Sequence, residues 1–167
     1  MKQITGDFDI KIARNYADLI NKCSSGEINF EERSGAEGVV IFCGDHAIKH
    51  PYPGDSKIFN GRLNGLINEF NIGKGLEDIG VNVPKMHGVY VRDDEMPFLI
   101  MGRLNITDFE KLSRKERQEA IKQYAEQRVI AESAGYAPGD VNYETNCGFG
   151  RKQNKLFFYD FTDWRKN

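Results

Sequence analysis

A lysine that follows a pair of glycines is the first group in this chain whose type and spacing suit chemistry. Gly35 and Gly38 lie between two strand-like runs, and Lys49 ends the next run, His46-Ala47-Ile48-Lys49. A glycine turn brings backbone N–H groups close to phosphate oxygens, and a lysine on the following strand reaches the same oxygens as a point charge. The pattern predicts a phosphate-binding loop, although an ordinary hairpin turn would use the same glycines.

The lysine needs a partner, because fixing its long side chain costs conformational entropy. Glu69 lies in the next expected helix, beside the apolar positions Leu66 and Phe70. That placement lets the carboxylate face inward, so we expect Glu69 to pair with Lys49. Two separately solvated side chains are the alternative.

A second group of polar residues, near the C-terminal end, suits metal binding and proton transfer. Asp140 follows a glycine-containing stretch, Asn146 comes after a short loop, and Asp160 ends the apolar run 155–159. Magnesium takes amide and carboxylate oxygens beside phosphates and water, so Asn146 and Asp160 are candidate metal ligands. Asp140 is a candidate for orienting or deprotonating an attacking hydroxyl. The alternative is that all three are turn and cap residues.

The elements that must position these residues follow from the hydrophobic period and from glycine and proline. We expect strands at 8–12, 28–32, 38–43, 47–50, 86–91, 97–101 and 155–159, and helices at 15–22, 55–78, 107–112 and 113–134. Ser113 and Glu116 have the spacing of a capping box at the start of the last helix. A break near Gly102 predicts an α+β chain of two lobes, residues 1–101 and 102–167, with a cleft between them.

Composition limits the classes of function. The 167 residues carry a formal net charge of −2, with 40% hydrophobic and 29% charged residues, which is ordinary for a globular protein. Such a balance gives no general attraction for nucleic acid, which we expect not to be a partner. No apolar run could span a bilayer, residues 1–9 contain no apolar signal segment, and the three cysteines lack metal-ligand spacing. We therefore expect a cytoplasmic protein without a zinc site or a membrane partner.

Taken in order, these motifs resemble those of the protein kinase-like superfamily, including its atypical RIO kinases and aminoglycoside phosphotransferases. The matching parts are a glycine-rich loop, a lysine strand, the partner of that lysine, a linker, an adenine-binding strand with its hinge, a catalytic loop and a metal motif. In the same order, these parts correspond to residues 35–40, 46–49, 69, 80–86, 97–103, 139–146 and 160–162. The resemblance covers most of the chain.

The resemblance implies a bilobal fold with an antiparallel five-stranded N-lobe carrying one helix, and a reduced helical C-lobe. It implies binding of ATP and Mg²⁺, catalytic roles for Asp140, Lys49 and Glu69, and metal binding by Asn146 and Asp160. The implied contacts with the nucleotide are Gly35, Gly38, Val40, Ala47, Lys49, Met101 and Arg103.

The chain also departs from the family pattern. Pro138 stands in place of the histidine before the catalytic aspartate, and Thr162 in place of the glycine in the metal motif. One extra residue precedes Asn146, so Asn142 competes with it as the metal-side amide. Only seven residues follow Asp160, so we expect a truncated C-lobe without an activation segment.

Three functions remain open at this point. A minimal kinase would transfer the γ-phosphoryl group of ATP to a protein, itself included, or to a small molecule. A pseudokinase would keep the fold and act as a nucleotide-binding or protein-interaction module, and a non-kinase α+β binding protein would have these spacings by chance. We favour the first, because every group that would contact phosphate or metal is present. We also expect a homo-oligomer or a partner at the C-lobe, whose short form leaves apolar helix surface uncovered.

Overall fold

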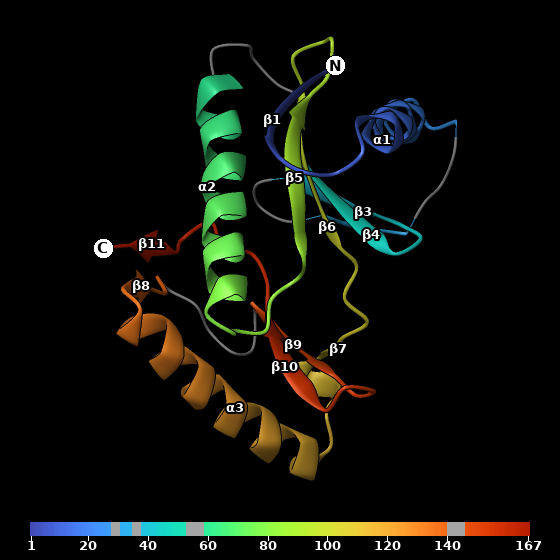
Figure 1. The fold of residues 1–167 in the computed structure, drawn as a ribbon. Helices are drawn as coiled ribbons and strands as arrows, with labels where there is room; N and C mark the ends of the chain where they lie inside the picture. Colours follow the sequence, from blue (N-terminus) through green and yellow to red (C-terminus); the bar gives the residue numbers. More distant parts are fainter. Residues whose placement is uncertain (28–30, 35–37, 53–58, 140–145) are drawn as a thin grey trace. The chain divides into compact units, whose positions relative to one another are not determined.

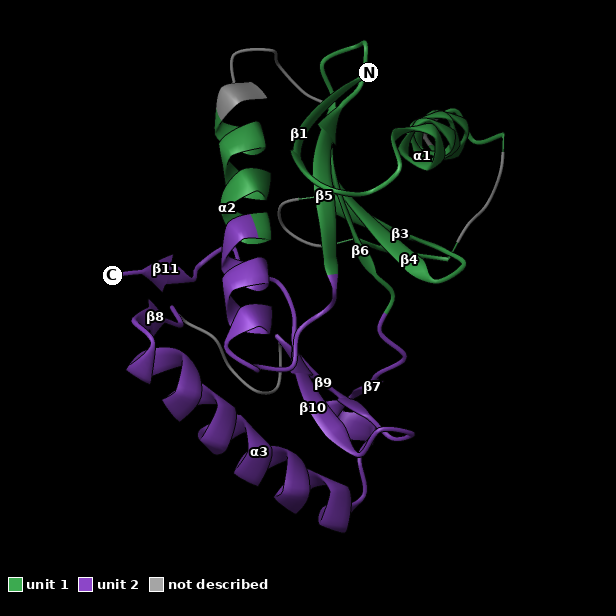
Figure 2. Cartoon of the chain, in the orientation of Figure 1, with its two compact units in different colours: residues 1–70, 86–103 green, residues 71–85, 104–167 purple. Residues whose placement is uncertain are grey.

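The structure is a computed structural model that describes residues 1–27, 31–34, 38–52, 59–139 and 146–167 (Figure 1). The chain divides into two compact units, coloured separately in Figure 2: residues 1–70 with 86–103, called unit 1, and residues 71–85 with 104–167, called unit 2. Helix α2 (Phe59–Asp78) contributes residues to both units. None of the described helices combines the length and the apolar composition that crossing a bilayer requires.

Unit 1 is built on a six-stranded antiparallel sheet with the strand order β1-β5-β6-β4-β3-β2. The strands are β1 (Lys2–Gly6), β2 (Glu32–Ser34), β3 (Gly38–Cys43), β4 (His46–Pro51), β5 (Met86–Val91) and β6 (Pro97–Gly102). A tight turn joins β3 to β4, and Gly44 in that turn has a φ of +55°, which suits glycine. The sheet therefore holds the lysine strand β4 between β3 and β6.

Helix α1 (Ile10–Ser24) covers one face of this sheet. Its N-cap is Asp9, whose carboxylate accepts a hydrogen bond from Lys11 N at 2.7 Å. The core on this face consists of buried residues from α1 and four strands: Ala13, Tyr16, Ala17, Ile20, Ile41, Ile48, Tyr90, Phe98 and Ile100. Because side chains alternate along a strand, Lys49 points to the opposite face from Ile48 and α1.

The expectation of five strands and one helix in the first lobe is wrong. The sheet has six strands, and α1 is present in addition to α2. The apolar alternation at 8–12 predicted a strand, but the Asp9 cap starts a helix there. The additional strand β1 pairs with β5, whose partner residues lie far along the chain, as in Lys2 with Val91.

Unit 2 contains the C-terminal part of α2, the helix α3 (Arg114–Ser133) and several short strands. A hairpin of β9 (Cys147–Gly150) and β10 (Lys155–Phe158) is extended by β7 (Thr107–Asp108), while β8 (Tyr136–Ala137) pairs with β11 (Arg165–Lys166). The helix expected at 107–112 is instead β7 followed by one 3-10 turn, η2 (Phe109–Lys111). Unit 2 is therefore less helical than the reduced helical lobe that we expected.

Helix α3 begins at the predicted capping box and covers the edge of the hairpin. Ser113 Oγ accepts from Glu116 N at 3.3 Å, and Glu116 Oε2 accepts from Ser113 N at 2.8 Å. Leu156 N on the edge strand β10 donates to Gln123 Oε1 at 2.8 Å, and Gln127 Nε2 donates to Leu156 O at 3.3 Å. These glutamine side chains supply the hydrogen bonds that a neighbouring strand would otherwise make.

Candidate functional site

Lys49 and Glu69 form a buried ion pair in unit 1. The Nζ atom of Lys49 lies 2.8 and 3.0 Å from the two carboxylate oxygens, and the two side chains are 12% and 4% exposed. Lys49 comes from β4, and Glu69 comes from the part of α2 that lies on the other side of the sheet from α1 (Figure 1). The predicted pairing is present. Since both charges are withdrawn from water, the pair holds an amine in a defined place on this face of the sheet.

An apolar platform lies beside this amine. The strand registers pair Lys49 with Val40, and Ala47 with Met101, so the alternation of side chains puts all four on the face away from α1. Ala47 and Met101 are buried, at 4% and 9% exposure. Apolar side chains on the same sheet face as a fixed cation are the kind of lining that suits a planar base linked to a phosphate chain. Gly38, the first residue of β3, is the register partner of Pro51. Gly35 lies outside the described residues.

Arg103, the other predicted nucleotide contact in unit 1, is engaged within the protein. Its Nη2 lies 2.5 Å from Glu31 Oε2, its guanidinium stands 5.0 Å from the centroid of the Phe42 ring, and its backbone N donates to Asp45 O at 2.8 Å. Phe42 is the register partner of Ala47 and shares the platform face. Sequence reasoning missed Phe42, although the alternation of residues 38–43 places it on the same side as Val40.

In unit 2, Asn146 and Asp160 lie on the two facing segments at the open end of the β9–β10 hairpin. Tyr159 N donates to Asn146 O at 3.0 Å, which continues the pairing of Phe158 with Cys147 by one residue. Asp160 then turns the chain with a φ of +62°, in the left-handed region that disfavours side chains. Thr162 Oγ1 donates to Asp160 Oδ1 at 2.9 Å. Asp160 therefore combines a strained backbone with an exposed carboxylate that a hydrogen bond holds in place.

These two oxygen donors fit magnesium, which commonly takes one or two protein ligands and completes its shell with phosphates and water. No cluster of three or more His, Cys, Asp or Glu residues able to hold a metal occurs in the described part of the chain.

Asp140 and the competing amide Asn142 lie outside the described residues. The residue before them, Gly139, packs tightly against the turn that follows Asp160: a Cβ on Gly139 would stand 2.6 Å from Asp163 O.

Buried titratable groups elsewhere are structural. Burial lowers the pKa of His50, whose Nδ1 lies 3.0 Å from Pro51 O, and keeps its ring neutral. Burial raises the pKa of the Cys147 thiol to about 12. The Cys147 thiol therefore lacks the properties of a nucleophile at neutral pH, and the buried His50 ring is engaged with its own strand.

The sequence matches no protein-family model and no curated protein. Solved structures are similar to it. The Rio2 kinase–ADP/Mg²⁺–phosphoaspartate complex from Chaetomium thermophilum superposes with a TM-score of 0.60 and 15% identity, over 91% of this chain and 53% of that one. Two structures of WbdD, one of them with a kinase inhibitor, give TM-scores of 0.59 and 0.62 at 15% identity, over 84% of this chain and 34% of theirs.

These similarities establish a protein kinase-like fold. At this level of identity they establish the fold alone. The chain spans about half of the Rio2 kinase chain and about a third of the WbdD chain.

Proposed function

We propose that this protein is a minimal ATP-dependent phosphotransferase. It binds ATP with Mg²⁺ and transfers the γ-phosphoryl group to a protein, itself included, or to a small molecule. The observation that carries the proposal is the buried Lys49–Glu69 ion pair on an apolar sheet face, because such a pair adds little to the stability of a fold and a fixed amine suits a phosphate-binding site. The kinase-like fold supports it, as does the presence of ADP and Mg²⁺ in the Rio2 structure.

Unit 1 supplies the contacts with the nucleotide. Lys49 neutralises phosphate oxygens while Glu69 fixes its amine, and Val40, Ala47 and Met101 pack on the base. Phosphoryl transfer asks a protein mainly to position groups and to neutralise charge, and a pre-oriented amine does both without reorganising during the reaction. Arg103 closes the end of β6 through its bond to Asp45 O, so its backbone N is not the donor to the base.

Unit 2 supplies the groups for the metal and the acceptor. Asn146 and Asp160 hold Mg²⁺, which when bound neutralises the charge on the transferring phosphoryl group. Thr162 orients the Asp160 carboxylate through its hydroxyl. Asp140 orients the acceptor hydroxyl and takes its proton.

The test combines binding with turnover. Trp164 is the one tryptophan of the chain, is 1% exposed and packs on Phe158 and Phe161, so its fluorescence reports changes around Asp160. We expect MgATP to change this fluorescence and radiolabelled ATP to be turned over by the purified protein. Lys49→Met should abolish both effects, and Asp140→Asn should keep binding but lose about 100-fold or more in turnover. Lys85→Met, an exposed lysine, is the matched control.

The outcomes separate the candidate functions. Binding without turnover in the unaltered protein would make it a pseudokinase, the second candidate, which the substitutions at Pro138 and Thr162 favour. If the folded protein neither binds nor turns over MgATP, both candidate functions are refuted.

A further inference from the structure

A basic surface lies at the tip of the β9–β10 hairpin, at the opposite end from Asn146 and Asp160. It consists of six residues from the hairpin, η2 and the start of α3, which we call the basic tip: Lys111, Arg114, Lys115, Arg151, Lys152 and Lys155. Arg151 links the hairpin to η2 and α3, since its Nε lies 2.9 Å from Glu116 Oε1 and its Nη2 donates to Lys111 O at 3.1 Å. The surface is therefore one connected feature of unit 2.

Four of its cations are not neutralised within the described chain. Lys111 pairs with Asp108 and Arg151 with Glu116, whereas Arg114, Lys115, Lys152 and Lys155 are exposed and make no ion pair with a described residue. Such side chains are available to carboxylates of another molecule.

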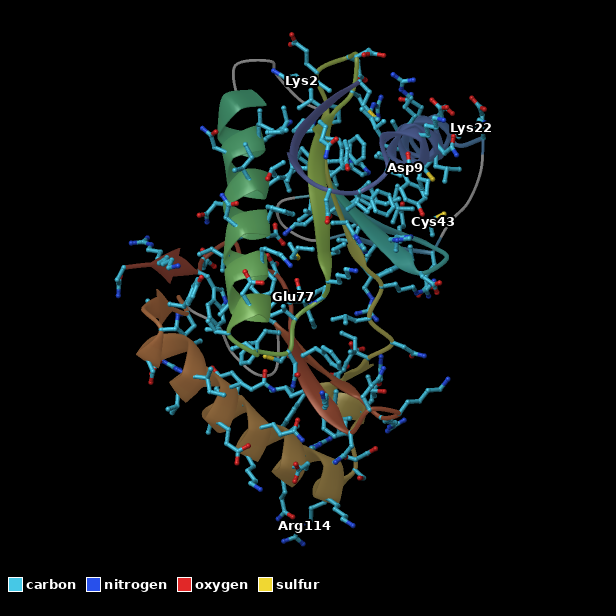
Figure 3. All side chains as sticks on the ribbon, viewed as in Figure 1. Lys2, Asp9, Lys22, Cys43, Glu77 and Arg114 are labelled. Carbon is cyan, nitrogen blue, oxygen red and sulfur yellow. The ribbon has the colours of Figure 1, made fainter. Side chains whose placement is uncertain are left out.

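Two of these cations oppose the stability of the helix that carries them. Arg114 and Lys115 occupy the first turn of α3, where the helix dipole favours acidic residues, and Figure 3 shows Arg114 at that end. Residues that break a local rule without a gain inside the fold are expected at functional positions. The arrangement therefore indicates a binding role.

The hairpin sets the distance from this surface to the candidate metal ligands. Its ladder runs without interruption from Lys155 paired with Gly150 to Phe158 paired with Cys147, and the bond from Tyr159 to Asn146 extends it. The five residue steps from Lys155 to Asp160 span at most roughly 17 Å, at about 3.4 Å per residue of extended backbone. An extended peptide spans that length with about five residues.

We propose that the acceptor is an acidic protein segment, whose Asp and Glu side chains dock on the basic tip about five residues from the hydroxyl that receives the phosphoryl group. The inference rests on the proposed function. The acceptor oxygen forms a bond to the γ-phosphorus, the bond from that phosphorus to the β–γ bridging oxygen breaks, ADP leaves, and the hydroxyl proton passes to Asp140, as in the proposed function, and then to water. Nucleic acid suits this surface less well, because no described aromatic side chain of unit 2 is exposed for base stacking.

The probes are three fluorescein-labelled peptides that contain one serine. One carries a block of four acidic residues centred about five positions from the serine, the second carries glutamines at these positions, and the third carries lysines. Each peptide is made in two versions, with the block N-terminal or C-terminal to the serine. Anisotropy without nucleotide measures docking, and transfer from radiolabelled ATP measures phosphorylation. We expect the acidic peptide to bind on the order of tenfold more tightly than the glutamine peptide at low salt, and this advantage to shrink at high salt.

Charge reversals locate the docking. Lys152→Glu with Lys155→Glu, and separately Arg114→Glu with Lys115→Glu, should each remove most of the advantage. The second pair also improves the helix dipole interaction, so a loss of binding there cannot be attributed to unfolding. Lys2→Glu with Lys11→Glu, exposed residues of unit 1, is the control with the same change in net charge (Figure 3 labels Lys2).

The two proposals fail in different ways. Equal binding of the three peptides, or preference for a single-stranded RNA of equal charge, would overturn the docking surface even if the protein labels itself with ATP. Docking that depends on the basic tip, in a protein without turnover, would keep the surface and refute the phosphotransferase.

Discussion

Removing one member of the Lys49–Glu69 pair should destabilise unit 1 strongly, whereas removing both should not. Lys49→Met removes the positive charge that pairs with a carboxylate that is 4% exposed, and Glu69→Leu removes the negative charge that pairs with an ammonium that is 12% exposed. Breaking a buried pair from one side costs about 3–5 kcal/mol, a large part of the roughly 5–15 kcal/mol that stabilises a typical domain. In the double variant both charges are gone and apolar side chains of similar size fill the space, so its free energy of unfolding should equal or exceed that of the unaltered protein.

The assay is urea unfolding followed by far-ultraviolet circular dichroism. Trp164 belongs to unit 2, so its fluorescence in the same samples reports whether that unit is affected as well. The unaltered protein, the two single variants and the double variant form a double-mutant cycle. It gives the coupling free energy between Lys49 and Glu69, which we expect to be about 3 kcal/mol or more. Lys85→Met should stay within about 0.5 kcal/mol of the unaltered protein.

Single variants that each lose less than about 1 kcal/mol, with additive effects in the double variant, would refute this reasoning, because exposed pairs behave in that way. The double variant also separates stability from function. It should fold and yet fail to bind MgATP, because the amine that contacts the phosphates is missing.

Four further predictions concern single positions. Gly65→Ala in α2 meets open space and should stabilise by about 0.5–1 kcal/mol, whereas Gly75→Ala in the same helix would overlap the hydroxyl of buried Tyr136 and should cost about 1–3 kcal/mol in thermal or urea unfolding. Gln127→Leu leaves Asn82 N and Leu156 O without their partner and should cost about 2–4 kcal/mol, against less than about 0.5 kcal/mol for exposed Gln118→Leu. Hydrogen bonds from Ser113, then Arg151, hold the pKa of Glu116 at about 2 instead of 4.5, so its stabilisation is present above pH 4.5 and is lost as the pH falls toward 2; melting temperatures of the unaltered protein and Glu116→Gln should converge over that range. Asp160→Gly relieves the left-handed backbone and should leave the melting temperature equal or higher, while MgATP turnover disappears.

Local signals predicted much of the fold. The capping box at Ser113 and Glu116 correctly predicted the start of α3, and the turn at Gly44 correctly predicted the β3–β4 hairpin. The strands expected at 86–91 and 97–101 are present as β5 and β6. In each case a few neighbouring residues determine the backbone, so the sequence contains the whole cause.

Features that depend on distant partners could not be predicted in this way. The strand β1 exists because β5 is available to pair with it, and the short strands β8 and β11 form only where residues 136–137 meet residues 165–166. Gln123 and Gln127 look like exposed helix positions in the sequence, but they hydrogen-bond to the edge strand β10. The position of Glu69 beside apolar residues favoured its pairing with Lys49, and the resemblance added the long-range contact that periodicity does not contain.

Three features among the described residues, each at a proposed functional position, oppose the stability of this small protein. A buried ion pair stands where apolar side chains would be at least as stable, two cations occupy the first turn of α3 against the helix dipole, and Asp160 adopts a backbone conformation that suits glycine. Packing and secondary structure account for none of them. The proposed function gives each a reason: an amine for phosphates, a surface for an acidic acceptor and a fixed carboxylate for magnesium. Stability and activity should therefore move in opposite directions when these positions are changed, and a set of variants in which the two fall together would mean that the positions serve the fold after all.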